Sequence, residues 1–144
     1  MAVALMSTAC RDLLGLPWQA GGRDPRVALG CYGLVLELYR RCGVAAPTLW
    51  QPAADGSDVH AFSMALMASL PDFWDPIPGP EPMALAVLPS DWCATGGHCG
   101  VVLADDVLAH ATIRQGTLFE PLPRARLRVL AWYRLRGTRW TVRP

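Results

Sequence analysis

The stretch Leu29-Gly30-Cys31-Tyr32-Gly33-Leu34-Val35 places a cysteine where a turn-rich loop meets an amphipathic segment. Apolar residues recur at helical spacing from Leu34 to Cys42, and Gly43 is a typical helix stop. The sequence therefore predicts a helix that begins at Cys31. The macrodipole and the unpaired backbone N–H groups at such a helix end stabilise a thiolate and can hold an oxyanion. Cys31 is thus a candidate nucleophile, and the alternative is a buried structural thiol.

Two histidines lie in apolar runs that are typical of strands. His98 opens the run over residues 98–103, and His110 closes the run over residues 107–110. A three-residue hairpin loop between the runs would place Gly100 opposite His110 and make His98 its diagonal neighbour, whereas a two-residue loop would place the histidines on opposite faces. We expect His98 to be the base, with Nε2 facing the Cys31 thiol and Nδ1–H donating to His110. The alternative is that one or both histidines only hydrogen-bond within the sheet.

Composition and charge exclude several classes of protein. The 144 residues are 52% hydrophobic and 17% charged, which fits one compact domain over residues 1–144. The net charge of +1 gives no field that favours nucleic acid or a membrane surface. Arg124, Arg126 and Arg128 alternate with apolar residues, which predicts a strand with a solvated basic face. A nucleic-acid-binding strip is the alternative, and the near-neutral total charge disfavours it.

The five cysteines form an odd set without repeated spacing, so no disulfide framework is expected. The apolar residues 1–10 lack the basic start of a signal peptide and are too few to span a membrane. We therefore expect synthesis in the cytoplasm without a signal peptide, and no membrane span.

Zinc binding is an alternative use of the same residues. Cys93, His98, Cys99 and His110, together with Cys31, have the residue types of zinc ligands. The chain has no Cys-x-x-Cys pair, and adjacent strand residues such as His98 and Cys99 point to opposite faces. We therefore expect neither a metal nor a cofactor.

Helical patterns precede strand patterns along the chain, which predicts an α+β fold with a largely antiparallel sheet. The expected helices cover residues 2–14, 31–42 and 57–70. Loops rich in proline are expected over residues 44–56 and 71–82. The expected strands cover residues 83–88, 98–103, 107–112 and 127–133.

This combination resembles the NlpC/p60-type family of papain-like cell-wall cysteine peptidases. The similarity is carried in order by Leu-Gly-Leu-Pro-Trp at 14–18, Cys-Tyr-Gly-Leu-Val at 31–35, His-Cys-Gly-Val-Val-Leu at 98–103 and Leu-Ala-His-Ala at 108–111. It covers nearly the whole chain. The resemblance implies a reduced papain-like fold, in which a helical N-terminal half carries the nucleophile at a helix N-terminus and packs on a largely antiparallel sheet.

The resemblance also implies roles for individual residues. Cys31 would be the nucleophile, His98 the base and His110 the third, polar member. The residues expected to bind substrate are Trp18, Tyr32, Gly33 and Gly97.

The implied activity is hydrolysis of an amide bond in peptidoglycan stem peptides, usually the bond between D-glutamate and the diamino acid, without a cofactor. The sequences at 31–35 and at 130–134, Leu-Ala-Trp-Tyr-Arg, look most like the branch found in tailed phages, prophages and gene-transfer particles. That branch implies phage-tail-tip proteins as partners and delivery to the cell wall as part of a phage-like particle.

Two residues depart from the family pattern. Gly30 stands where the family usually has Asp, and Trp18 stands where Tyr is common. These departures leave two alternatives open. One is a structural tail-tip module of the same fold with little catalysis, and the other is an amidase or acyltransferase acting on a substrate outside the cell wall.

Overall fold

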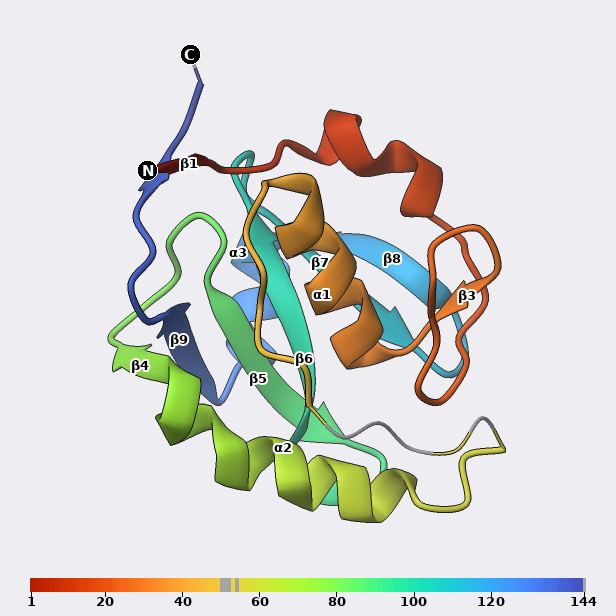
Figure 1. Cartoon of the computed structure of the whole chain (residues 1–144). Coiled ribbons are helices and arrows are strands. Elements are labelled where there is room, and N and C mark those ends of the chain that lie inside the picture. The colour runs from red at the N-terminus through yellow and green to blue at the C-terminus, as the bar shows by residue number, and fades with distance from the viewer. Residues whose placement is uncertain (50–52, 54, 144) are drawn as a thin grey trace.

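The computed structural model describes residues 1–49, 53 and 55–143, and its centre is a six-stranded antiparallel sheet (Figure 1). The strand order is β4-β9-β5-β6-β7-β8. The strands of this sheet are β4 (Trp74–Ile77), β5 (Leu85–Ser90), β6 (Cys93–Leu103), β7 (Val107–Thr112), β8 (Gly116–Pro121) and β9 (Ala131–Leu135). The short strands outside it are β1 (Ala2–Val3), parallel to β10 (Trp140–Thr141), and β2 (Arg23–Asp24), antiparallel to β3 (Ala28–Leu29).

Helices cover both faces of the sheet. On one face, α1 (Cys31–Arg41) and α2 (Val59–Phe73) enclose the main core, and on the other face the short α3 (Leu122–Ala125) covers a smaller cluster (Figure 1). This is the expected α+β arrangement, with a helical first half packed on a largely antiparallel sheet. Among the described residues, no helix combines the length and the apolar character needed to cross a bilayer.

The helix that begins at Cys31 forms as predicted, because its apolar stripe faces the core. Leu34, Leu38 and Tyr39 on this stripe are fully buried. At the C-terminal end, Gly43 adopts a φ of 76° and its N–H donates to the Arg40 carbonyl. The N–H of the next residue reaches back to the Tyr39 carbonyl, so the helix ends in a Schellman motif that satisfies its last carbonyls.

Four segments differ from the prediction. Residues 2–14 contain β1 and the 3-10 helix η1 (Ser7–Leu13) instead of one α-helix, because Ala2–Val3 pair with β10. The basic strip falls in α3 and η2 (Arg126–Arg128), and the strand begins only at Ala131. The predicted loop over 71–82 contains the end of α2 and all of β4. Strand β8 was not predicted. Residues 50–52 and 54 of the predicted loop over 44–56 lie outside the described residues.

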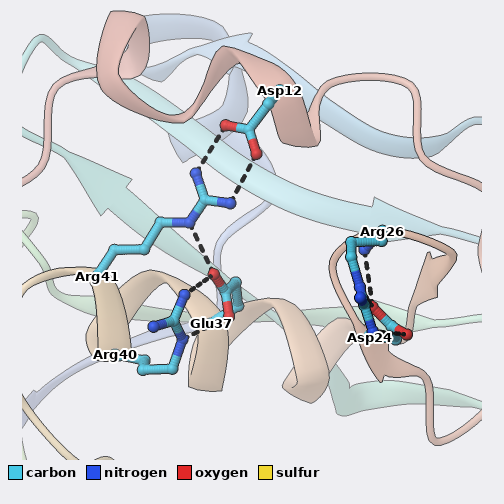
Figure 2. Close-up of polar contacts among 6 residues, drawn as sticks. All are labelled: Asp12, Asp24, Arg26, Glu37, Arg40 and Arg41. Carbon is cyan, nitrogen blue, oxygen red and sulfur yellow. Dashed lines mark hydrogen bonds and ion pairs between the residues drawn. The ribbon is translucent and has the colours of Figure 1, made fainter.

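A network of charges fixes α1 against η1 (Figure 2). Arg41 makes a bidentate pair with Asp12, at 2.7 Å for both contacts, and its Nε donates to Glu37 at 2.7 Å. The Glu37 carboxylate is almost fully buried and also accepts two hydrogen bonds from Arg40. The Arg40 contacts, followed by those of Arg41, lower the pKa of Glu37 despite its burial. The charge of Glu37 is therefore compensated, and the helix that carries Cys31 is held in place at its other end.

Candidate active site

A cavity of about 280 Å³ opens at the N-terminus of α1. Cys31, His98 and His110 all line it, so the structure brings the three predicted catalytic side chains together. The predicted substrate-binding residues that also line this cavity are Trp18, Tyr32 and Gly97. The fourth, Gly33, is not among the lining residues, because its Cα faces the Gly22 carbonyl.

Glycines allow the chain to pack tightly around the start of α1. A Cβ on Gly33 would lie 1.8 Å from the Gly22 carbonyl oxygen, so only glycine fits at this position. The same oxygen accepts a hydrogen bond of 3.0 Å from the Gly30 N–H. A Cβ on Gly30 would lie 3.0 Å from the Gln19 carbonyl oxygen, which is tight for any larger residue. The absence of Asp at position 30 is therefore matched by a turn over 19–22 that lies close to the helix start.

The turn over 19–22 leads into the β2–β3 hairpin, which is closed by a local ion pair. Arg26 pairs with the Asp24 carboxylate through both its guanidinium and its backbone N–H (Figure 2). Arg26 is largely exposed and Asp24 is half-buried, so we assign the pair a local role in the hairpin.

The β6–β7 hairpin brings His98 and His110 together. Leu103 pairs with Val107 and Gly100 pairs with His110, so the loop has three residues, as the diagonal arrangement requires. The last loop residue has a φ of 58°, the left-handed conformation that commonly closes such loops. His98 Nε2 lies 2.8 Å from His110 Nδ1. The predicted pairing is confirmed, but the predicted ring orientation is wrong, because Nε2 of His98 faces His110 and Nδ1 is the nitrogen left for the thiol.

Gly100 provides the space for this pairing. It lies directly opposite His110, and a Cβ at this position would come within 2.9 Å of the His110 Cβ and 2.8 Å of the Ala109 carbonyl oxygen. Because Gly100 has no side chain, the two imidazoles can meet across the diagonal.

Two further side chains, which the sequence did not predict, extend the histidine pair. His110 Nε2 lies 2.8 Å from Oε1 of Glu120 on β8, and the second carboxylate oxygen of Glu120 accepts a hydrogen bond from Arg128 on η2. The described chain therefore contains a continuous polar series from His98 through His110 and Glu120 to Arg128. Glu120 could have been found from its place on the strand that pairs with the strand of His110, but that strand was not predicted.

The environment of Cys31 favours its thiolate. A hydrogen bond with the Cys99 thiol has the largest effect, and the His98 imidazole adds to it, so the pKa of Cys31 falls well below its usual value despite burial. Cys99 is fully buried, and the contact with Cys31 together with burial raises its own pKa well above the usual value. Cys99 therefore stays protonated and can donate to the Cys31 thiolate. A thiolate at a helix N-terminus beside an imidazole is equipped for nucleophilic attack.

His110 is neutral at physiological pH. The ring is only 2% exposed, and this burial, with the charge of His98 as a second cause, lowers the pKa of His110 to about 4. A neutral imidazole has one donor and one acceptor nitrogen, so it can join two hydrogen bonds of opposite direction.

The remaining candidate metal ligand lies apart from the others. The Cys93 sulfur is 3.2 Å from the Thr95 hydroxyl, and Cys93 does not line the cavity. Within the described ranges, no group of three or more His, Cys, Asp or Glu side chains is arranged to hold a metal ion.

The rest of the cavity wall is mainly apolar. Its charged side chains other than histidine are Asp91 and Arg128, and Arg128 is already paired with Glu120. The large apolar side chains on the wall are Trp18, Val59, Phe62, Leu88, Trp92 and Ile113.

No family model matches this chain, and no curated protein matches its sequence. A solved structure that is similar to it comes from Staphylococcus aureus subsp. aureus Mu50 and is described as similar to lipoprotein, NLP/P60 family, with a TM-score of 0.58 and 16% sequence identity. The match covers 90% of this chain and 39% of the staphylococcal chain, so this chain spans well under half the length of that protein. At this identity the similarity concerns the fold alone. The chain therefore has an α+β fold similar to that of an NLP/P60-family protein.

Proposed function

We propose that this chain is a cysteine peptidase that cleaves an amide bond in the stem peptides of peptidoglycan. The observation that carries the proposal is the meeting of Cys31, His98 and His110 in one cavity at the start of α1. The lowered pKa of Cys31 and the fold shared with an NLP/P60-family protein support it. The sequence resemblance to cell-wall peptidases supplies the substrate class, with the bond between D-glutamate and the diamino acid as the expected target.

The first half of the proposed reaction forms a thioester. His98 accepts the Cys31 proton through Nδ1, and the Sγ thiolate attacks the carbonyl carbon of the amide. The negative charge moves to the carbonyl oxygen, which the backbone N–H of Cys31 can stabilise, since the first N–H groups of a helix have no partner within the helix. His98 then gives its proton to the amide nitrogen, the C–N bond breaks, and the amine leaves.

The second half restores the enzyme. Water attacks the thioester carbon while His98 Nδ1 takes the proton, and the C–S bond breaks with the electron pair returning to Sγ. The stem-peptide acid leaves, and His98 returns its proton to Sγ, so that both Cys31 and His98 regain their starting states. Atoms and charges balance over the cycle with water as the only co-reactant.

Association with phage-tail-tip proteins and delivery to the cell wall in a phage-like particle remain predictions from the sequence resemblance. They are separate from the proposed chemistry, which depends only on the cavity residues.

The test is digestion of purified peptidoglycan by three proteins under reducing conditions: the wild type, Cys31→Ala and Cys93→Ala. Cys93 is the matched control because it is a partly exposed cysteine outside the cavity. Mass spectrometry of the released peptides should show cleavage by the wild type and by Cys93→Ala. Cleavage by Cys31→Ala should fall at least about 10³-fold, the usual scale for loss of a nucleophile. Equal release by Cys31→Ala, or none by the wild type, would contradict the proposal.

A second candidate function follows from the apolar cavity wall. Aromatic side chains such as Trp18 and Phe62 would suit an acyl donor with an uncharged, apolar acyl group, as in an amidase or acyltransferase that acts outside the cell wall. A panel of amide and ester substrates with polar or apolar acyl groups separates the two candidates. Cys31-dependent turnover of apolar donors without release of stem peptides would favour the second.

A further inference from the structure

We infer that Glu120, held by Arg128, is a positioning residue that fixes the protons on His110 and His98, so that His98 presents Nδ1 to Cys31. The inference rests on the proposed function, in which Cys31 is the nucleophile and His98 the base. It adds a residue on a third strand to the site and assigns it a specific effect on the base.

Glu120 lies in line with the two histidines. Gly100 pairs with His110, and Leu108 pairs with Glu120, so His98, His110 and Glu120 form a diagonal row over β6, β7 and β8. The two-residue period of strands places all three side chains on one face of the sheet. The contacts along the row are 2.8 Å between the histidines and 2.8 Å between His110 Nε2 and Glu120 Oε1. Both ring nitrogens of His110 are therefore engaged.

The charge of Glu120 is set by its burial and by its two hydrogen-bond partners. Burial opposes ionisation of this carboxyl, but the hydrogen bonds from Arg128 and His110 outweigh it and lower the pKa of Glu120. Glu120 is therefore a carboxylate at neutral pH, and a carboxylate can only accept hydrogen bonds. Arg128 donates to one oxygen, and His110 must donate to the other.

The negative charge of Glu120 fixes the positions of the protons along the row. Because Glu120 accepts, His110 carries its proton on Nε2, and the Nδ1 of the neutral ring can then only accept. His98 must donate to that nitrogen from its own Nε2. In the neutral His98 ring, Nδ1 is consequently unprotonated and available for the Cys31 proton. The negative charge of Glu120 also stabilises the positive ring that His98 becomes after it takes this proton.

A merely structural role predicts something different. If the Glu120–Arg128 pair only held η2 against β8, its removal would lower stability without changing which ring nitrogens carry protons. The charged and titratable side chains that bear on His110 are His98, Glu120 and Arg128. The ring protonation is therefore the measurement that separates the two roles.

Two-bond ¹⁵N–¹H correlation spectra of the labelled protein distinguish Nδ1–H from Nε2–H in each histidine. The chain has only three histidines, so a His60→Gln variant completes the assignment. At pH 7 the wild type should show His110 with its only proton on Nε2, and His98 with a proton on Nε2 to which the thiolate form of Cys31 adds a second on Nδ1. In Glu120→Met, His110 loses its acceptor and should become a mixture of the two forms. A wild-type His110 with its proton on Nδ1 would overturn the inference.

The second measurement is the rate at which iodoacetamide alkylates Cys31 between pH 5 and 9, followed on the Cys31 peptide by mass spectrometry. Loss of the carboxylate weakens the stabilisation of the His98 cation, so the rate at pH 6 should fall about tenfold in Glu120→Met. Glu120→Gln keeps the shape without the charge and should lie between the two, which preserves the test if the Met variant folds poorly. The matched control is Glu81→Met, because Glu81 also pairs with an arginine, Arg134, but lies outside this cavity.

These measurements separate the inference from the proposed function, because neither uses peptidoglycan. A wild type that leaves peptidoglycan intact, but whose ring protons and Cys31 reactivity respond to Glu120, would contradict the proposed function alone. A wild type that cleaves peptidoglycan, with Glu120→Met giving the same spectra and alkylation profile as Glu81→Met, would overturn the inference alone.

Discussion

At the scale of single residues, the Cys99 thiol and the His98 imidazole both lower the pKa of Cys31. Cys99 follows His98 on β6, and the alternation of the strand turns it into the core that packs under α1. There it meets Cys31 as a protonated thiol and stabilises the Cys31 thiolate. The low pKa of Cys31 thus has two sources, a thiol from one face of β6 and an imidazole from the other.

Because the Cys99 thiol is one of the two causes of the lowered pKa of Cys31, we predict that its removal changes this pKa. In Cys99→Ala the donor is lost, so the pKa of Cys31 should rise and its alkylation profile should move to higher pH. Cys99→Ser keeps a hydroxyl donor of similar size and should leave the profile near that of the wild type. Peptide-resolved alkylation between pH 5 and 9 measures both, and thermal melting confirms that both variants fold. Equal shifts in Ala and Ser would mean that packing, not donation, controls Cys31.

The same residues show how much of the candidate site could be predicted from the sequence. Cys31, His98 and His110 were predicted because each stands at the end of a clear helical or strand pattern, and the register of the histidines followed from one loop length. Glu120 was missed because its position depends on the pairing of β7 with β8, which no local pattern announces. The nitrogen that faces the thiol depends on the Glu120 contact, so it could not be predicted without that strand.

At the scale of elements, the start of α1 depends on how closely the turn over 19–22 approaches it. Gly33→Ala puts a methyl group 1.8 Å from the Gly22 carbonyl oxygen, and the backbone must move to relieve the clash. We expect the free energy of unfolding to fall by more than about 2 kcal/mol. Activity should fall as well, since Ala20 and Gly21 of this turn line the cavity.

Gly79→Ala is the matched control for this prediction, because no atom lies within 4 Å of a Cβ at Gly79. Urea unfolding of the two variants gives the comparison. A Gly33→Ala protein as stable as Gly79→Ala would show that the turn is free to move away from the helix.

Two segments were predicted wrongly because the spacing of their apolar or charged residues differs from the structure that they adopt. The first residues have helical spacing, yet Ala2 and Val3 pair with β10 from the far end of the chain. Arg124, Arg126 and Arg128 alternate as strand residues do, yet Leu122 and Ala125 pack on the sheet at helical spacing, which a period of two does not reveal. In both segments a long-range contact overrides a weak local preference.

At the scale of the whole molecule, segments far apart in the chain complete one another. Strand β9 comes late in the sequence but lies between β4 and β5, and so joins β4 to the rest of the sheet (Figure 1). The candidate site draws on α1, β6, β7, β8 and η2, so its side chains span residues 31–128. Because the site exists only when these segments are folded together, the ionisation of a buried site residue is coupled to the stability of the folded chain.

His110 makes that coupling measurable. Its pKa of about 4 in the folded chain lies below the ordinary value of 6.5, so between these pH values the unfolded chain binds a proton that the folded chain excludes. The free energy of unfolding should therefore fall as pH decreases from 6.5 to 4, by about 3 kcal/mol from this group. Urea unfolding at pH 7, 5.5 and 4.5 should show a shallower loss in His110→Asn than in the wild type. The exposed His60 on α2 supplies the control, and His60→Asn should follow the wild type. Parallel curves for all three proteins would mean that the folded chain accepts the proton on His110 without cost.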